Sequence, residues 1–208
     1  MIKHLYLVRH GETIYNSEGR IQGGGLDSPL TKEGILQAEK LRDYLNSKSF
    51  QVDLIFSSPL ERSLHTARIV SEVLEGEIVP DPLLKEINCG EMEGKFINSI
   101  DTEKLRRLRI DPLEKYPGGE SVDDVRHRAE NFLVKLYESE SESAIIFSHG
   151  NFLRAFCSAA TGLSSSLAMK IYLDNTGFSY LFRSGEYFRV SLWNSTSHLG
   201  IIQKRIVT

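Results

Sequence analysis

The sequence predicts an α/β fold, a three-layer α/β/α sandwich with a mostly parallel central sheet and a short helical cap insertion. Two short apolar runs, over 5–8 and 144–147, have the length and composition of buried strands. Each run ends within two residues of a His-Gly pair, at His10 and at His149. Strand patterns alternate with amphipathic helical patterns through most of the chain, which favours a sheet covered on both faces.

Turn residues and apolar spacing predict the remaining elements in order. Thr31 has the side chain of a helix N-cap and precedes a helix with Ala38, Leu41 and Leu45 on its apolar face. A strand over 52–56 is closed by Ser57-Ser58-Pro59, and the helix after it has Leu60, Leu64, Ala67, Val70 and Leu74 on one face. Ser121 opens a further helix, with Val125, Ala129, Phe132, Leu133 and Leu136 on one face. The run at 144–147 leads into a helix through Phe152 and Phe156 that stops near Gly162, and strands over 178–182 and 187–193 are joined across Ser184-Gly185.

Residues 98–119 interrupt this alternation. Lys104, Arg106, Arg107 and Arg109 make the segment basic, and Pro117-Gly118-Gly119 ends it. One interpretation is a short helical cap over a binding site, and the other is a helix face whose charges are simply solvated. From the sequence alone the second interpretation is favoured. We expect a single domain over 1–208 with this cap inserted in it.

Composition limits the classes of protein that remain. The chain has 208 residues, of which 40% are hydrophobic and 25% charged, enough for one domain with a substantial core. A formal net charge of −3 argues against a general nucleic-acid binder. The apolar run after Met1 is too short for a signal peptide or a membrane span, so we expect no membrane partner. Cys89 and Cys157 form no Cys-x-x-Cys pair, which fits a reducing, cytoplasmic setting.

Basic and imidazole side chains gather where the predicted strands end. Because ligands bind at the carboxyl ends of parallel strands, Arg9, His10 and His149 are expected to share one site. Arg62 falls in the first turn of a helix, where a cation is unfavourable unless an anion is bound there. With the glycine-rich loop at 23–25, these residues suit a phosphate dianion. The alternatives are solvated histidines at two strand ends and a surface salt bridge at Arg62.

Other phosphate chemistries lack their residues. The chain has no Gly-x-x-x-x-Gly-Lys-Ser/Thr loop, no Asp-x-Asp pair after the first strand and no arginine six positions after either cysteine. It has no His-Glu-x-x-His motif for zinc, and we predict no metal site and no cofactor. By elimination, the nucleophile should be a histidine.

These motifs together resemble the histidine phosphatase superfamily, in its phosphoglycerate mutase-like branch. The resemblance covers nearly the whole chain. It is carried by the motifs Leu7-Val8-Arg9-His10-Gly11-Glu12-Thr13 with Asn16, Gln22-Gly23, Ser57-Ser58-Pro59-Leu60-Glu61-Arg62, Glu86, Pro117-Gly118-Gly119-Glu120-Ser121 and Ser148-His149-Gly150.

The resemblance implies a role for each matching residue. His10 would attack phosphorus and form a phosphohistidine, for which its ring must be neutral. Arg9, Arg62 and His149 would hold the non-bridging oxygens, and Asn16, Gln22, Gly23 and Gly150 would add neutral donors. Glu86 would protonate the leaving oxygen and then activate water, which requires a pKa above the free value of ~4.3. Without the resemblance, Glu86 would be taken for a surface carboxylate.

The resemblance leaves the reaction open between a phosphatase and a mutase. Mutases of this family have a longer insertion with an arginine pair, and a tyrosine three residues after the acid. Here that position is Cys89, the insertion is short, and Arg106-Arg107 aligns only loosely with the pair. The pattern favours the group of broad-specificity, α-ribazole and phosphoserine phosphatases, acting on a small-molecule phosphate monoester. A phosphoglycerate mutase and a non-catalytic phosphate-binding protein stay as alternatives.

Two further expectations concern features outside the phosphate site. Substrate specificity should lie in the cap at 98–119 and in the segment with Cys89 and Met92. The aromatic strands near the C-terminus could pair across the subunits of a homodimer.

Overall fold

One six-stranded sheet lies at the centre of the computed structural model, which describes residues 1–200. Its strands are β1 (His4–Arg9), β2 (Leu54–Ser57), β3 (Ile78–Pro80), β4 (Ser143–Ser148), β5 (Phe178–Ser184) and β6 (Tyr187–Ser195), in the order β3-β2-β4-β1-β5-β6. The first four strands of that order pair in parallel, β5 pairs antiparallel with β1, and β6 pairs antiparallel with β5. The mostly parallel sheet is confirmed. The short strand β3 was missed because three residues give no periodicity. Residues 201–208, the end of the expected domain, lie outside the described residues.

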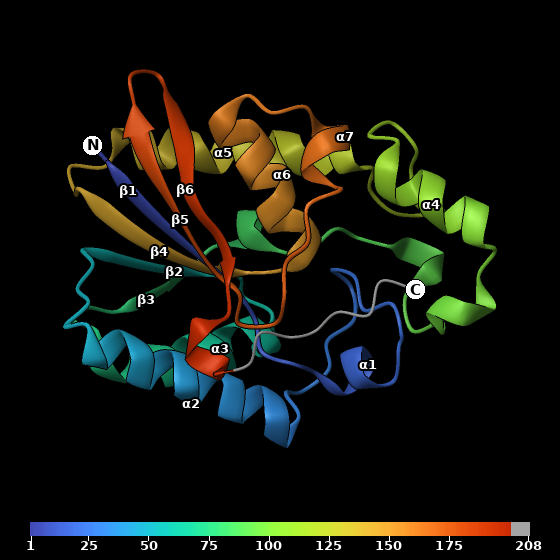
Figure 1. Ribbon diagram of the computed structural model, residues 1–208. Coiled ribbons are helices and arrows are strands. Elements are labelled where there is room, and N and C mark those ends of the chain that lie inside the picture. Colours follow the sequence, from blue (N-terminus) through green and yellow to red (C-terminus); the bar gives the residue numbers. More distant parts are fainter. Residues whose placement is uncertain (201–208) are drawn as a thin grey trace.

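Helices cover both faces of the sheet (Figure 1). The α-helices of the described residues are α1 (Ile14–Ser17), α2 (Lys32–Ser47), α3 (Glu61–Val70), α4 (Thr102–Ile110), α5 (Val122–Glu138), α6 (Gly150–Thr161) and α7 (Ser165–Ala168). α2 and α3 pack on one face, α5 and α6 on the other. Successive residues of β1 point to opposite faces, so Val8 belongs to the α2/α3 core and Leu7 to the α5/α6 core. The predicted three-layer α/β/α sandwich is therefore confirmed.

The helix boundaries follow the predicted capping residues. Thr31 caps α2 by accepting a hydrogen bond from the Gly34 amide at 3.0 Å. Ser121 caps α5 and forms a capping box with Asp124. α6 ends at Gly162, which adopts the left-handed conformation that glycine tolerates best.

The parallel pairing of β1 with β4 brings the two His-Gly pairs together. Arg9 is the register partner of Ser148, and the His10 amide donates to the Ser148 carbonyl at 3.0 Å. His10 and His149 therefore leave the sheet side by side at the same edge. The ring centroids of the two histidines are 5.2 Å apart.

The cap insertion is helical and stands to one side of the sheet (Figure 1). A 3-10 turn at Ile97–Ser99 leads into α4, which buries Leu105 and Leu108. Arg106 and Arg107 are exposed, as expected for a solvated face. Arg109 does not fit that favoured interpretation, because it lines a cavity.

No helix within residues 1–200 has the length and apolar character needed to cross a membrane. Cys89 and Cys157 are both free thiols and both buried.

Close backbone packing fixes the loop after His10 against α2. A Cβ on Gly34 would lie 2.0 Å from the Glu12 carbonyl oxygen, and one on Gly11 would lie 2.4 Å from the Gly34 carbonyl oxygen. Neither neighbour is a flexible side chain, so only glycine fits at these two positions.

We predict that Gly34→Ala destabilises the fold. Alanine is favoured over glycine inside a helix by about 1 kcal/mol, but overpacking costs about 1–3 kcal/mol. The free energy of unfolding should therefore fall, measured by urea denaturation. The exposed neighbour substitution Glu33→Ala is the control. A Gly34→Ala protein more stable than the wild type would show that the loop moves away freely.

Candidate active site

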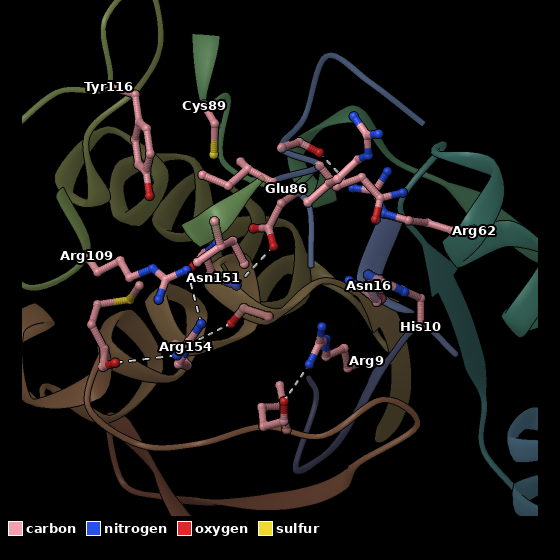
Figure 2. Close-up of a pocket in the computed structure, with 18 of the residues that line it drawn as sticks. Arg9, His10, Asn16, Arg62, Glu86, Cys89, Arg109, Tyr116, Asn151 and Arg154 are labelled. Carbon is pink, nitrogen blue, oxygen red and sulfur yellow. Dashed lines mark hydrogen bonds between the residues drawn. The ribbon is translucent and has the colours of Figure 1, made fainter. Parts of the chain in front are cut away.

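A cavity of about 340 Å³ opens beside the carboxyl ends of β1 and β4 (Figure 2). Of the residues predicted from the sequence, its wall contains Arg9, His10, Asn16, Gln22, Gly23, Arg62, Glu86 and Gly150. His149 is fully buried behind this wall and does not line the cavity. Eight of the nine predicted residues are thus brought to one cavity, and the ninth lies beside His10.

His10 is held as a neutral ring with a defined tautomer. Its Nδ1 lies 2.7 Å from the Gly11 carbonyl oxygen, which can only accept, so Nδ1 carries the proton. The lone pair is then on Nε2. Burial holds the pKa of His10 well below its ordinary value, and the positive charges of Arg62 and Arg9 lower it further. The ring therefore has the protonation state that a nucleophile requires.

His149 supports Arg62 in this structure. Arg62 Nε donates to His149 Nδ1 at 3.1 Å, so the proton of the neutral His149 ring lies on Nε2. That nitrogen is 2.7 Å from Ser58 Oγ and donates to it. Burial, followed by the charge of Arg62, keeps the pKa of His149 well below its usual range. Both ring nitrogens are therefore engaged by protein groups.

Arg62 is a buried residue, which rules out the surface salt bridge considered above. Its side chain is 1% exposed. Nη2 donates to the Gly23 carbonyl at 2.7 Å, and Nη1 donates to Asp27 Oδ1 at 2.9 Å. The ion pair with Asp27 offsets the unfavourable position of a cation in the first turn of α3. Arg62 thus ties the glycine-rich loop to the start of α3.

Two buried donors of the cavity wall have no hydrogen-bond partner among the described residues. Arg9 uses Nη1 to donate to the Leu173 carbonyl at 2.7 Å, which leaves its Nε unpaired. The Oε1 atom of Gln22 accepts a hydrogen bond from Thr13 Oγ1 at 3.0 Å, and the Nε2 atom of the same side chain is unpaired. Buried polar groups are nearly always satisfied, so unpaired donors on one wall indicate an anion. The N-terminus of α6, which begins at Gly150, also favours a negative charge at this place.

The glycine-rich loop is fixed by a second carboxylate. Gly23 has a φ of +64°, and a Cβ there would lie 2.1 Å from Glu93 Oε1. That oxygen accepts from the amides of Gly25 and Cys89, each at 3.0 Å. Glu93 therefore joins the glycine-rich loop of the cavity wall to the segment that follows Glu86.

Glu86 is oriented by three backbone amides. Its Oε1 accepts from Ile87 at 2.9 Å and from Phe152 at 3.0 Å, and its Oε2 accepts from Asn151 at 3.2 Å. Figure 2 shows the carboxyl group between Arg62 and Asn151, in the same cavity as His10. The alternative of an unengaged surface carboxylate is therefore wrong. Within residues 1–200, no three His, Cys, Asp or Glu side chains gather in a way that could hold a metal ion.

Several cavity residues were missed or misplaced by sequence reasoning. Arg154 lies one helical turn after Gly150, and its Nε donates to the Gly150 carbonyl at 2.9 Å. This spacing on the predicted helix was the available signal. The cap contributes Arg109 and Tyr116, which no local pattern distinguishes from surface residues. Of the segment in which specificity was expected, Cys89 lines the cavity and Met92 is buried in the core.

The family model described as "Histidine phosphatase superfamily (branch 1)" matches residues 5–196. The chain belongs to this superfamily. A protein of Hydrogenobacter thermophilus named "Putative phosphoserine phosphatase 2" is 35% identical over 95% of this chain and 98% of its own. A Proteus mirabilis protein named "Probable phosphoglycerate mutase GpmB" is 34% identical over 84% of this chain and 82% of its own.

Solved structures of phosphatases superpose on the same fold. A mycobacterial glucosyl-3-phosphoglycerate phosphatase in complex with VO3 has a TM-score of 0.85 at 28% identity, covering 93% of this chain and 99% of that one. A mutant phosphoserine phosphatase from Entamoeba histolytica, in complex with phosphoserine, has a TM-score of 0.80 at 26% identity, covering 94% and 98%. Membership in this superfamily of phosphatases and mutases supports an enzyme that acts on phosphate esters.

The buried neutral histidines predict how stability depends on pH. The pKa of His10 is lowered in the folded state, so below a pH of about 6.5 the unfolded chain binds a proton that the folded chain does not. The free energy of unfolding should therefore fall as the pH is lowered from about 7.5 to about 5. Each such histidine contributes up to about 1.4 kcal/mol per pH unit to this slope. We expect His10→Asn to reduce this slope by about that amount.

Urea denaturation over this pH range, in buffers free of phosphate, measures the slope. His65→Asn on α3, a site outside the cavity wall, is the control and should retain the wild-type slope. Equal slopes for the wild type and His10→Asn would mean that folding leaves the pKa of His10 unchanged and does not hold the ring neutral.

Proposed function

We propose that this chain is a metal-independent phosphatase that hydrolyses small-molecule phosphate monoesters through a phosphohistidine on His10. One observation carries the proposal above all. His10 is neutral and buried, and Nδ1 is engaged by the Gly11 carbonyl, so the Nε2 lone pair remains for attack beside two arginines. Positive charge from Arg9 and Arg62 supplies the electrostatic stabilisation that a metal ion provides in other phosphatases.

In the first step, Nε2 of His10 attacks phosphorus as the ester P–O bond breaks. The electron pair of that bond goes to the leaving oxygen, which takes a proton from Glu86. Arg9 Nε, Gln22 Nε2 and the start of α6 are the donors that would hold the non-bridging oxygens. Arg62 adds positive charge from its buried position.

In the second step, Glu86 takes a proton from water as the water oxygen attacks phosphorus. The P–N bond breaks, and its electron pair returns to Nε2 of His10. Inorganic phosphate leaves with the new oxygen, and Glu86 is protonated again. The three amides that orient Glu86 keep its carboxyl group in the cavity through both steps.

A phosphoglycerate mutase is the second candidate, favoured by the name of the Proteus mirabilis relative. We favour the phosphatase because Cys89 lines the cavity at the position where the family's mutases carry a tyrosine, and because the cap holds only one short helix. Incubation with 3-phosphoglycerate separates the two, since a mutase forms 2-phosphoglycerate and a phosphatase releases phosphate.

We predict that His10→Asn lowers the turnover of p-nitrophenyl phosphate by about 10³-fold or more, because the nucleophile is lost. His65→Asn should retain wild-type turnover, and EDTA should leave the wild-type rate unchanged. Rapid quenching followed by intact-mass analysis and phosphorus NMR should detect an acid-labile phosphohistidine in the wild type alone. A phosphate-binding protein without catalysis would show the same negligible turnover before and after the substitution.

We predict that Glu86→Gln slows alkyl phosphates far more than aryl phosphates. An alkoxide needs a proton to leave, whereas p-nitrophenolate does not, and a positioned general acid contributes about 10²–10⁴-fold. The measurement compares glycerol 3-phosphate with p-nitrophenyl phosphate, with Glu91→Gln, an exposed carboxylate near the cavity, as the control. Equal slowing of both esters would exclude Glu86 as the proton donor.

A further inference from the structure

One side chain of α5 holds the backbone of the segment that carries Glu86. The Nη1 atom of Arg128 donates to the carbonyls of Leu83, at 2.7 Å, and Lys85, at 2.9 Å. The Nη2 atom of Arg128 donates to the carbonyl of Glu86 itself at 3.3 Å. Arg128 does not line the cavity at His10. It therefore reaches Glu86 through the main chain, on the side away from the cavity.

Glu120 pairs with Arg128 and contacts the same segment further along. Its two carboxylate oxygens accept from Arg128 Nε and Nη2, each at 3.0 Å, in the paired geometry that a guanidinium and a carboxylate favour. Glu120 Oε2 also accepts from the Asn88 amide at 2.8 Å, and the Glu120 amide donates to the Asn88 carbonyl at 2.9 Å. Arg128 thus uses each of its five N–H groups within the protein.

The Pro-Gly-Gly-Glu-Ser motif at 117–121 presents Glu120 to this segment. A Cβ on Gly119 would lie 2.2 Å from the Asn88 carbonyl oxygen, so the two backbones pack at a distance that only glycine allows. None of the residues 117–121 lines the cavity at His10. The contacts of this motif are made instead with the backbone that follows Glu86, which gives the motif a place in the site without a contact to the ligand.

Arg128 also packs against a second residue that holds Glu86. The Phe152 amide donates to Glu86 Oε1 at 3.0 Å. The guanidinium carbon of Arg128 lies 5.6 Å from the centre of the Phe152 ring, within the range of a cation–π contact. Arg128 therefore contacts both the main chain from which the carboxyl group extends and a residue that donates to that carboxyl group.

We propose that Arg128 and Glu120 are positioning residues, which set the place of the Glu86 carboxyl group for its proton transfers. This inference rests on the proposed function, because it takes Glu86 as the proton donor. A general acid must lie within hydrogen-bond reach of the leaving oxygen. The pair holds the main chain before Glu86 and after it, at Asn88, so its loss would let the carboxyl group shift. A misplacement of about 1 Å can cost about 10²-fold in rate.

The choice of leaving group distinguishes positioning of Glu86 from a general loss of structure. We expect Arg128→Gln to lower kcat/KM for glycerol 3-phosphate by about ten- to hundredfold. The value for p-nitrophenyl phosphate should change little, because p-nitrophenolate leaves without a proton. The control is Arg126→Gln, which removes an arginine of the same helix whose ion-pair partners are Asp123 and Glu130. Equal slowing of both esters by Arg128→Gln, or the same selective slowing in the control, would overturn the proposal.

A double-mutant cycle tests whether Arg128 acts through Glu86. In the Glu86→Gln protein no carboxyl group remains to be positioned, so adding Arg128→Gln should slow the hydrolysis of glycerol 3-phosphate little further. Losses that multiply in the double variant would show that Arg128 acts independently of Glu86, and the positioning role would then be wrong.

Glu120→Gln provides a second variant, and urea denaturation shows whether each variant is folded. Glutamine keeps the size of the side chain but replaces one acceptor oxygen by a donor, so it cannot accept from Arg128 Nε, Arg128 Nη2 and the Asn88 amide together. It should slow glycerol 3-phosphate more than p-nitrophenyl phosphate, as Arg128→Gln does. A folded Glu120→Gln protein with equal slowing of the two esters would contradict the pair.

The failure of the positioning pair and that of the proposed function give different results. Selective slowing in Glu86→Gln but not in Arg128→Gln contradicts the pair alone. An absence of all turnover in the wild type contradicts the phosphatase, and hydrogen exchange then tests whether the pair holds this segment. The Asn88 and Glu120 amides should exchange faster in Arg128→Gln than in Arg126→Gln, and equal exchange in the two variants would reject the pair.

Discussion

The constraint on which the rest of the site depends is the burial of positive charge. Removing a guanidinium from water is costly unless it is paired and hydrogen-bonded. Arg62 meets this condition within the protein, through Asp27, the Gly23 carbonyl and His149. Arg9 does not meet it fully, because its Nε stays unpaired among the described residues. The unpaired donors of this wall fit an anion, which is why we propose that a phosphate dianion binds there.

The same positive field sets the state of the two histidines. Burial and the neighbouring arginines lower the pKa of both rings, so both are neutral. Their hydrogen-bond partners then assign different tautomers. The Gly11 carbonyl accepts a hydrogen bond from Nδ1–H of His10, so the lone pair of that ring is on Nε2. The Arg62 guanidinium donates to Nδ1 of His149, which is therefore the acceptor nitrogen of that ring. Two identical side chains thus differ in role, His10 as the proposed nucleophile and His149 as a support for Arg62.

Sequence patterns predicted the parts of the site that depend on local rules. The strand ends at Arg9 and His149 follow from short apolar runs, and the unfavourable place of Arg62 in the first turn of a helix placed this residue in the same predicted site as Arg9. Contacts between distant segments could not be predicted in this way. Glu86 is held by the Phe152 amide, and the exact place of His149 depends on Arg62 and Ser58 rather than on its own strand. Such contacts are set by packing, which periodicity does not describe.

The two ends of the cavity differ in how firmly the fold holds them. At the end of the cavity near His10, a Cβ at Gly34 would lie 2.0 Å from the Glu12 carbonyl oxygen, and one at Gly23 would lie 2.1 Å from Glu93 Oε1. The positions of this backbone and of this carboxylate are therefore tightly constrained. At the far end, Leu105 and Leu108 anchor α4 while Arg109 stays exposed on its last turn. A substitution at Arg109 changes the charge of the cavity wall without opening the core beneath it. The end of the cavity at His10 is therefore tied to the fold, whereas the cap end is lined by an exposed residue that can change independently of the core.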